Sequence, residues 1–197
     1  MGLPYGLVRP RGPVLNYSGA GLAKLLGDVD HEYAFPAVRT TGTLAAEGRT
    51  NQVSGVSWLD RQWGPVPVTD PSMRWTWMDI ALPDGDQLAL WDVLDNQAQD
   101  SWVTVLHPDG SYAIAAVRPL AGAARGLWTS PVTHKRYRTR WNIDIPALGC
   151  DLGVAITGPK GQEYPDGHVE GTAAVTGTCN GTNVTGTTFV EMTGDWN

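Results

Sequence analysis

From residue 33 onward, short segments of alternating hydrophobic and polar residues are separated by turn residues, a pattern typical of β-strands. The motif "PDG" divides this pattern twice. It occurs at 83–85, between "WTWMDIAL" and "QLALWDV", and at 108–110, between "SWVTVLH" and "SYAIAAV". Proline presets one turn dihedral and glycine accepts the positive one, so both motifs predict antiparallel hairpins.

The later segments continue this rhythm with glycine at expected bends or bulges: "RYRTRWNIDIP", "CDLGVAIT", "HVEGTAAVTGT" and "TGTTFVEMTG". Only residues 19–28, "GAGLAKLLGD", can form a short helix, and the start of the chain is extended and rich in Pro and Gly. We therefore expect an all-β antiparallel fold of about eight to ten strands with little helix, closed into a barrel or folded into a sandwich. Residues 1–37 would be a lead-in and 38–197 the β-domain.

Tryptophan is over-represented, with nine Trp against two Phe. Such an excess indicates either a heavily filled core or an aromatic-lined cavity. Alternation places Trp75 and Trp77 on one face of their strand and Met78 and Ile80 on the other, so neither face is plainly solvent-exposed.

The charge and the number of cysteines limit which binding partners and which cellular compartment we expect. The net charge is -6 and the only basic cluster is "KRYRTRW" at 135–141, so we do not expect nucleic acid as a partner. No apolar run is long enough to span a bilayer and the N-terminus lacks the apolar region of a signal peptide, so we expect a soluble cytoplasmic protein. There Cys150 and Cys179 would be free thiols, a single bridge being the alternative.

Metal and cofactor chemistry are not indicated. The four histidines fall in predicted loops or at strand ends without ligand-like spacing: His31, His107, His134 and His168. No glycine-rich phosphate loop precedes a helix, so we expect neither a metal site nor a cofactor.

Four motifs, in order, carry a family resemblance. They are "GVSWLDRQWG", the Trp-rich strand with its "PDG" hairpin leading to "LALWDV", "SPVTHKRYRTRWNIDIP", and "VEGTAAVTGTCNGTNVTGTTFVEMTG". Over roughly residues 38–194 the chain resembles the C-terminal half of the lipocalin-like family of carotenoid 1,2-hydratase and AttH-type proteins, which includes natural-product Diels-Alderases. The resemblance implies a calycin-type antiparallel β-barrel with an apolar interior.

Two departures from the hydratase pattern stand out. Only about 50 residues precede the first motif, so we expect the first half to be absent, supplied either by another chain or by self-association into a homo-oligomer. Arg61 stands where the hydratases tend to have His. Both departures weaken the transfer of hydratase activity but leave the barrel intact.

Asp92 is the candidate proton donor for hydration. Leu88, Leu90 and Leu94 share its face, and burial among apolar side chains favours a protonated carboxylic acid. The resemblance also places an acid near this strand. The alternative is a structural, hydrogen-bonded aspartate.

Alternation divides the polar residues of "GVSWLDRQWG" between two faces. Leu59, Arg61 and Trp63 share one, which we expect to line the interior because the family's His and second Trp fall there. Arg61 would hold an acidic head group of the substrate with its fork of donors, the alternative being an outward arginine that bridges surface acids. Asp60 is the third catalytic candidate, but we expect it to anchor the wall as a carboxylate. The remaining substrate-binding candidates are Trp75, Trp77, Trp91, Trp141 and Glu191, the last of which caps the barrel or pairs with Arg61.

Three functions follow from these residues. The first is a natural-product cyclase that encloses an apolar polyene or polyketide and promotes cyclisation, chiefly [4+2] cycloaddition, by orienting the reacting groups. The second is a hydratase of an isoprenoid double bond that uses Asp92. The third is a carrier of the same kind of apolar ligand.

Overall fold

The computed structural model describes residues 6–8, 14–15, 22–25, 28–64, 72–94, 99–158, 162–164 and 167–196. The chain divides into two compact units, Met1–Val66 with Asp109–Ser111, and Pro67–Pro108 with Tyr112–Asn197. The boundary that we predict between residues 37 and 38 lies inside strand β4 (Asp28–Ala46). None of the helices among the described residues has the length and apolar character needed to cross a membrane.

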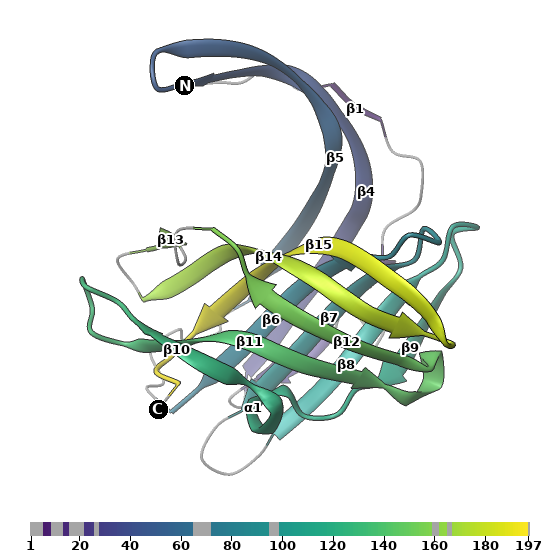
Figure 1. Ribbon diagram of the computed structural model, residues 1–197, viewed down its shortest axis with the longest axis vertical. Helices are drawn as coiled ribbons and strands as arrows, with labels where there is room; N and C mark the ends of the chain where they lie inside the picture. The colour runs from purple at the N-terminus through teal and green to yellow at the C-terminus, as the bar shows by residue number, and fades with distance from the viewer. Residues whose placement is uncertain are drawn as a thin grey trace. The chain divides into compact units, whose positions relative to one another are not determined.

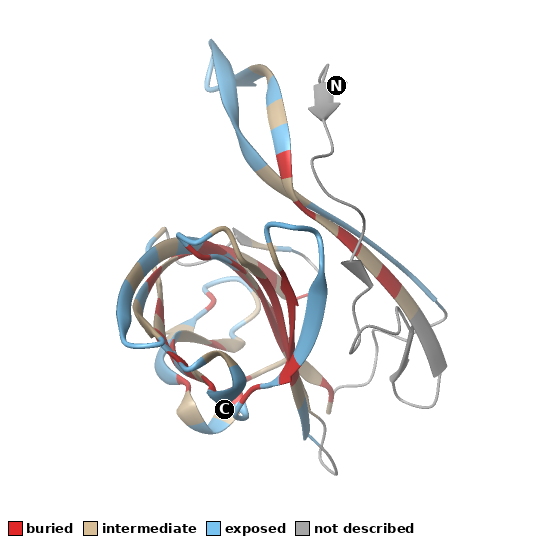
Figure 2. Ribbon diagram, turned by 90° about the vertical axis from the view of Figure 1, so that its right-hand side faces the viewer, coloured by how far each residue is buried: buried red, intermediate tan, exposed pale blue. Residues whose placement is uncertain are grey.

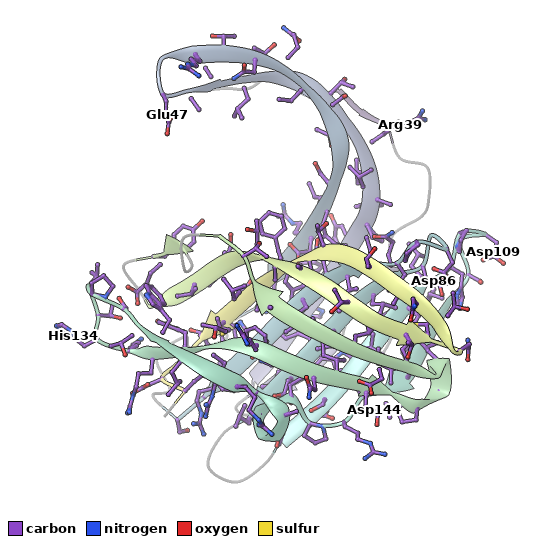
Figure 3. The ribbon with its side chains drawn as sticks, viewed as in Figure 1. Arg39, Glu47, Asp86, Asp109, His134 and Asp144 are labelled. Atoms are coloured by element: carbon purple, nitrogen blue, oxygen red, sulfur yellow. A yellow bond between two sulfur atoms is a disulfide. The ribbon has the colours of Figure 1, made fainter. Side chains whose placement is uncertain are left out.

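The smaller unit is built around the long hairpin of β4 and β5 (Arg49–Trp63), seen as the curved pair of blue strands in Figure 1. Glu47 and Gly48 form its tip, both with positive φ, as a two-residue hairpin turn requires (Figure 3). Three short strands also pair with β4: β1 (Gly6–Val8), β2 (Val14–Leu15) and β3 (Leu22–Leu25). Because residues 22–25 bond to β4 as a strand, the short helix that the sequence predicts there is wrong at those positions.

The larger unit contains a ten-stranded sheet with the path β10-β11-β12-β14-β15-β6-β7-β8-β9, in which β13 pairs with β14. All of the pairings described in it are antiparallel. The helical residues among those that the structure describes in this unit are one turn of α1 (Leu120–Ala123) and a 3-10 turn, η2 (Pro146–Leu148). The strands are β6 (Arg74–Ala81), β7 (Gln87–Leu94), β8 (Gln99–Leu106), β9 (Tyr112–Ala116), β10 (Arg125–Thr129), β11 (Arg136–Ile145), β12 (Cys150–Ile156), β13 (Gln162–Glu163), β14 (His168–Cys179) and β15 (Thr182–Thr193). The all-β antiparallel fold is therefore confirmed. Among the described residues, no ladder joins the two end strands of the path, β9 and β10.

Both "PDG" motifs form the predicted hairpins. Gly85 and Gly110 have φ of 95° and 88°, in the left-handed region that glycine accepts. The first turn joins β6 to β7 and is closed by the Gly85 amide, which donates to the Leu82 carbonyl at 3.0 Å. The second joins β8 to β9.

One face of the large sheet carries the hydrophobic core. The most deeply buried of its aliphatic side chains include Met78, Ile80, Leu88, Leu90, Val103, Val105, Ile143, Ile145, Leu152 and Val190. They alternate with residues of the opposite face along each strand, and Figure 2 shows the buried residues spread along these strands. The helical turn α1 packs against β11 and contributes the fully buried Leu120 to this core.

Cys150 and Cys179 are joined by a disulfide, so the prediction of free thiols is wrong. The register explains the bond: β12 and β14 pair with the two cysteines directly opposite each other, and their Cα atoms lie 4.0 Å apart. A separation of 29 residues in the sequence does not reveal this pairing.

Candidate functional site

A row of side chains crosses five neighbouring strands of the large sheet. Each member lies directly opposite the next, in the order Glu170 (β14), Glu191 (β15), Trp77 (β6), Trp91 (β7) and Trp102 (β8). Directly opposed residues of antiparallel strands point to the same face. Two carboxylates and three indoles therefore share the face opposite the hydrophobic core, and we call this set the Glu–Trp row.

The tryptophan part of the row is buried. The side chains of Trp77, Trp91 and Trp102 are buried, and the rings of Trp91 and Trp102 are stacked at an interplanar angle of 13° with centroids 6.1 Å apart. Offset stacking of this kind adds to the stability gained from burial. The partly exposed carboxylates thus lie at one end of a row of buried indoles.

His168 lies beside the two carboxylates and completes a cluster of three titratable groups. Its Nε2 is 3.7 Å from Glu170 Oε1 and 3.6 Å from Glu191 Oε1. The exposed fractions of the three side chains are 28%, 43% and 24%, so the cluster is open to a small molecule. We call these three residues the His–Glu cluster.

Two aromatic neighbours hold the His–Glu cluster in place. The Trp75 indole Nε1 donates a hydrogen bond to Glu191 Oε1 at 2.8 Å. On the other side, the Tyr164 ring stacks on the His168 imidazole, with centroids 5.1 Å apart and planes 25° apart. These contacts fix the orientation of one carboxylate and of the imidazole.

The chemistry available to the His–Glu cluster is proton transfer. A histidine takes up and releases a proton near neutral pH, and a carboxylate in hydrogen-bond reach of a substrate serves as acid or base. One ligand atom from each of the three side chains also lies within 4.8 Å of the other two, a spacing that a metal ion can bridge. The sequence argument against a metal site considered only spacing along the chain and stays a prediction.

Four of the residues that the sequence selects are brought together on this face: Trp75, Trp77, Trp91 and Glu191. Sequence reasoning missed His168, Glu170 and Trp102. The first two are two positions apart in "HVEG", and this spacing in a strand would have placed them on one face. The sequence predicts all four histidines in loops or at strand ends, and His168 is the first residue of β14.

Asp92 points to the opposite, core face. It is fully buried, and its Oδ1 accepts hydrogen bonds from Gln99 Nε2 at 2.9 Å and from Ser101 Oγ, while its Oδ2 accepts one from the Ala121 amide at 3.2 Å. Three donors around one carboxylate tie β7, β8 and α1 together. Trp141, which is 1% exposed, also lies in the core.

Asp60, Arg61 and Trp63 belong to the smaller unit, on β5. The alternation is as predicted, with Leu59, Arg61 and Trp63 opposite Phe35, Tyr33 and His31 on β4. Trp63 stacks on His31 with centroids 5.2 Å apart, yet 48% of it is exposed. Asp60 and Arg61 are exposed as well, so the roles assigned to these three residues stay predictions.

Known proteins share the fold of the whole chain. The model of the AttH-like family matches residues 10–195. Kievitone hydratase of Fusarium solani subsp. phaseoli is 27% identical over 143 residues, which are 69% of this chain and 40% of that protein.

Two crystal structures agree with this match. Kievitone hydratase from Nectria haematococca superposes with a TM-score of 0.82 at 20% identity, over 98% of this chain and 62% of that one. An AttH-type protein from Nitrosomonas europaea superposes with a TM-score of 0.74 at 19% identity, over 96% of this chain and 61% of that one. The chain thus spans less than two thirds of the length of these relatives, and the family model covers nearly all of it. The chain belongs to the AttH-like family.

Proposed function

We propose that this chain carries out hydratase-type chemistry, the addition of water to a carbon–carbon double bond of a small apolar molecule, at the His–Glu cluster. One observation carries the proposal: a histidine and two carboxylates meet, partly exposed, at the end of the Glu–Trp row. The relationship to kievitone hydratase supports the reaction type.

Hydration needs one group that gives a proton and one that receives a proton. In the proposed reaction, an acid of the His–Glu cluster protonates one alkene carbon, and water forms a bond to the other carbon. A neighbouring base then takes one of the two protons of that water. The net change is the addition of one water molecule. General acid–base catalysis by positioned groups is worth about 100- to 10,000-fold in rate, and a tryptophan face stabilises the positive charge that develops on carbon.

The proposal places the acid in the His–Glu cluster and not at Asp92. The Asp92 carboxylate is fully buried and already accepts hydrogen bonds from Gln99, Ser101 and the Ala121 amide. Glu191 and Glu170 are partly exposed and adjoin a histidine. Asp92 therefore fits the structural alternative that the sequence left open.

The cyclase and the carrier are the competing functions. The cyclase depends on Arg61, which is exposed on β5 in the smaller unit, and the hydratase relatives support water addition in its place. A carrier would bind the same kind of apolar ligand at the Glu–Trp row without changing it.

Mass spectrometry in water labelled with heavy oxygen separates the three functions. The probes are kievitone, which the name of the fungal relative gives as its substrate, and an acyclic isoprenoid polyene. We expect a product heavier than the substrate by one labelled water. A product of unchanged mass and altered retention would indicate cyclisation, and recovery of unchanged bound probe would indicate a carrier; either result contradicts the proposal.

A further inference from the structure

Tyr137 lies outside the His–Glu cluster but bonds to the segment that carries it. Its side chain is fully buried in the core, on β11. The hydroxyl donates to the Gly167 carbonyl at 2.8 Å and lies 3.0 Å from Glu163 Oε1. One buried hydroxyl thus contacts residues on both sides of Tyr164.

Two backbone hydrogen bonds connect Tyr164 with Gly167 and His168. The Gly167 amide donates to the Tyr164 carbonyl at 2.9 Å, and the Tyr164 amide donates to the His168 carbonyl at 2.7 Å. This geometry sets the Tyr164 ring against the His168 imidazole. Any shift of Gly167 therefore reaches both rings.

Glu163 is held from the other side by the loop between β10 and β11, where His134 is labelled in Figure 3. Ser130 Oγ and Thr133 Oγ1 both donate to its carboxylate, the second at 2.5 Å. Ser130 Oγ also accepts hydrogen bonds from the backbone amides of Val132 and Thr133, at 3.0 and 3.1 Å. The Glu163 carboxylate thus joins the β10–β11 loop to β13, and the Tyr137 hydroxyl beside it contacts Gly167.

The protonation states suit this arrangement. Burial raises the pKa of the Tyr137 hydroxyl, and the adjacent Glu163 raises it further, so the hydroxyl remains a donor. Burial acts to raise the pKa of Glu163, but hydrogen bonds from Ser130, Thr133 and Tyr137 and the charge of Lys135 outweigh it and lower the pKa. Glu163 is therefore a charged acceptor.

We infer that Tyr137 is a positioning residue of the His–Glu cluster: it holds Gly167, and through Gly167 and Tyr164 it fixes the His168 imidazole beside Glu170 and Glu191. The inference rests on the proposed function for its catalytic meaning, but the placement of His168 is measurable without any substrate. Tyr137→Phe removes the hydroxyl and keeps the ring, so that Gly167 O loses its donor and Glu163 Oε1 loses the hydroxyl 3.0 Å away.

The test is the pH titration of the His168 imidazole, followed by NMR and assigned among the four histidines with His168→Gln. Two carboxylates within 4 Å favour a charged imidazole. If Gly167 and Tyr164 shift in Tyr137→Phe, we expect the midpoint to fall, because the imidazole moves away from the carboxylates. The matched control is Tyr112→Phe, which removes the same atom from an exposed tyrosine on β9 and should leave the midpoint unchanged.

Turnover gives the second readout. A misplaced acid or base lowers kcat by about 10-fold or more with little change in KM. If Tyr137→Phe does not fold, Thr133→Val weakens the hold on Glu163 from the partly exposed loop and should move the His168 midpoint in the same direction. An unchanged midpoint in the folded variant overturns the inference. Absence of hydratase activity in the wild type would overturn only the proposed function.

Discussion

Two acidic side chains of the large sheet have opposite surroundings, and their surroundings suit different roles. Asp92 is fully buried with three donors. Glu191 is 24% exposed, accepts one indole N–H and lies 3.6 Å from a histidine. A buried carboxylate with its acceptors filled stabilises the fold, whereas a partly exposed one beside a histidine can exchange protons with a substrate.

The structural role of Asp92 predicts a large loss of stability in Asp92→Ala. The partly buried Ser101 hydroxyl and Ala121 amide and the exposed Gln99 amide would all lose their acceptor, at a cost of about 2–4 kcal/mol in the free energy of unfolding. Urea denaturation measures this loss. The matched control is Asp144→Ala, which breaks only the ion pair with the largely exposed Arg118 (Figure 3) and should cost less than about 1 kcal/mol. Equal stability of the two variants would refute the anchoring role.

Sequence reasoning at the residue scale succeeds where alternation decides the outcome. It divides Leu59, Arg61 and Trp63 correctly from Asp60, and it sets Trp75 and Trp77 apart from Met78. It cannot show what covers each face, because burial depends on strands that are distant in the chain. The sequence therefore predicts neither the exposure of Arg61 nor the three donors that surround Asp92.

At the scale of elements, turn chemistry is the most predictive feature of the sequence. "PDG" fixes the β6–β7 and β8–β9 hairpins through local dihedral preferences. The segment 22–25 has the residue spacing of a helix but forms a strand, because its backbone pairs with β4. This tertiary contact cannot be read from the local sequence. The same reason hides the pairing of Cys150 with Cys179.

The disulfide between β12 and β14 predicts that the purified, unfolded protein has no reactive thiol in a thiol assay before reduction and two after it. Removing the bond frees the unfolded chain. For a closed loop of 29 residues, Cys150→Ala with Cys179→Ala should lower the free energy of unfolding by about 3–4 kcal/mol. Detection of two thiols without reduction would contradict the bond.

The connection from the β10–β11 loop to β13 predicts a pH dependence. The pKa of Glu163 is lower in the folded chain than its ordinary value of 4.5, so the unfolded state binds a proton first as the pH falls. The stabilisation is therefore complete above about pH 5 and is lost as the pH drops through the folded-state pKa. Glu163→Gln should flatten the decline of unfolding free energy below pH 5 in urea titrations, and an unaltered pH slope would exclude this contribution.

At the scale of the whole molecule, the candidate site is a product of sheet order. The Glu–Trp row runs through β14, β15, β6, β7 and β8, so Glu191 lies directly opposite Trp77 although the two residues are far apart in the sequence. Nothing in the local pattern specifies this order. The sequence could therefore name Trp77, Trp91 and Glu191 as candidates but not assemble them with His168.

The central claim is that the His–Glu cluster carries the chemistry, and kcat/KM for water addition in Glu191→Gln tests it most directly. The substitution keeps the size of the side chain and removes its ability to exchange a proton. The control is Glu47→Gln at the exposed tip of the β4–β5 hairpin (Figure 3), with both variants confirmed as folded by their melting temperatures. We expect Glu191→Gln to lose about 100-fold or more and Glu47→Gln to match the wild type; full activity in Glu191→Gln would contradict the claim.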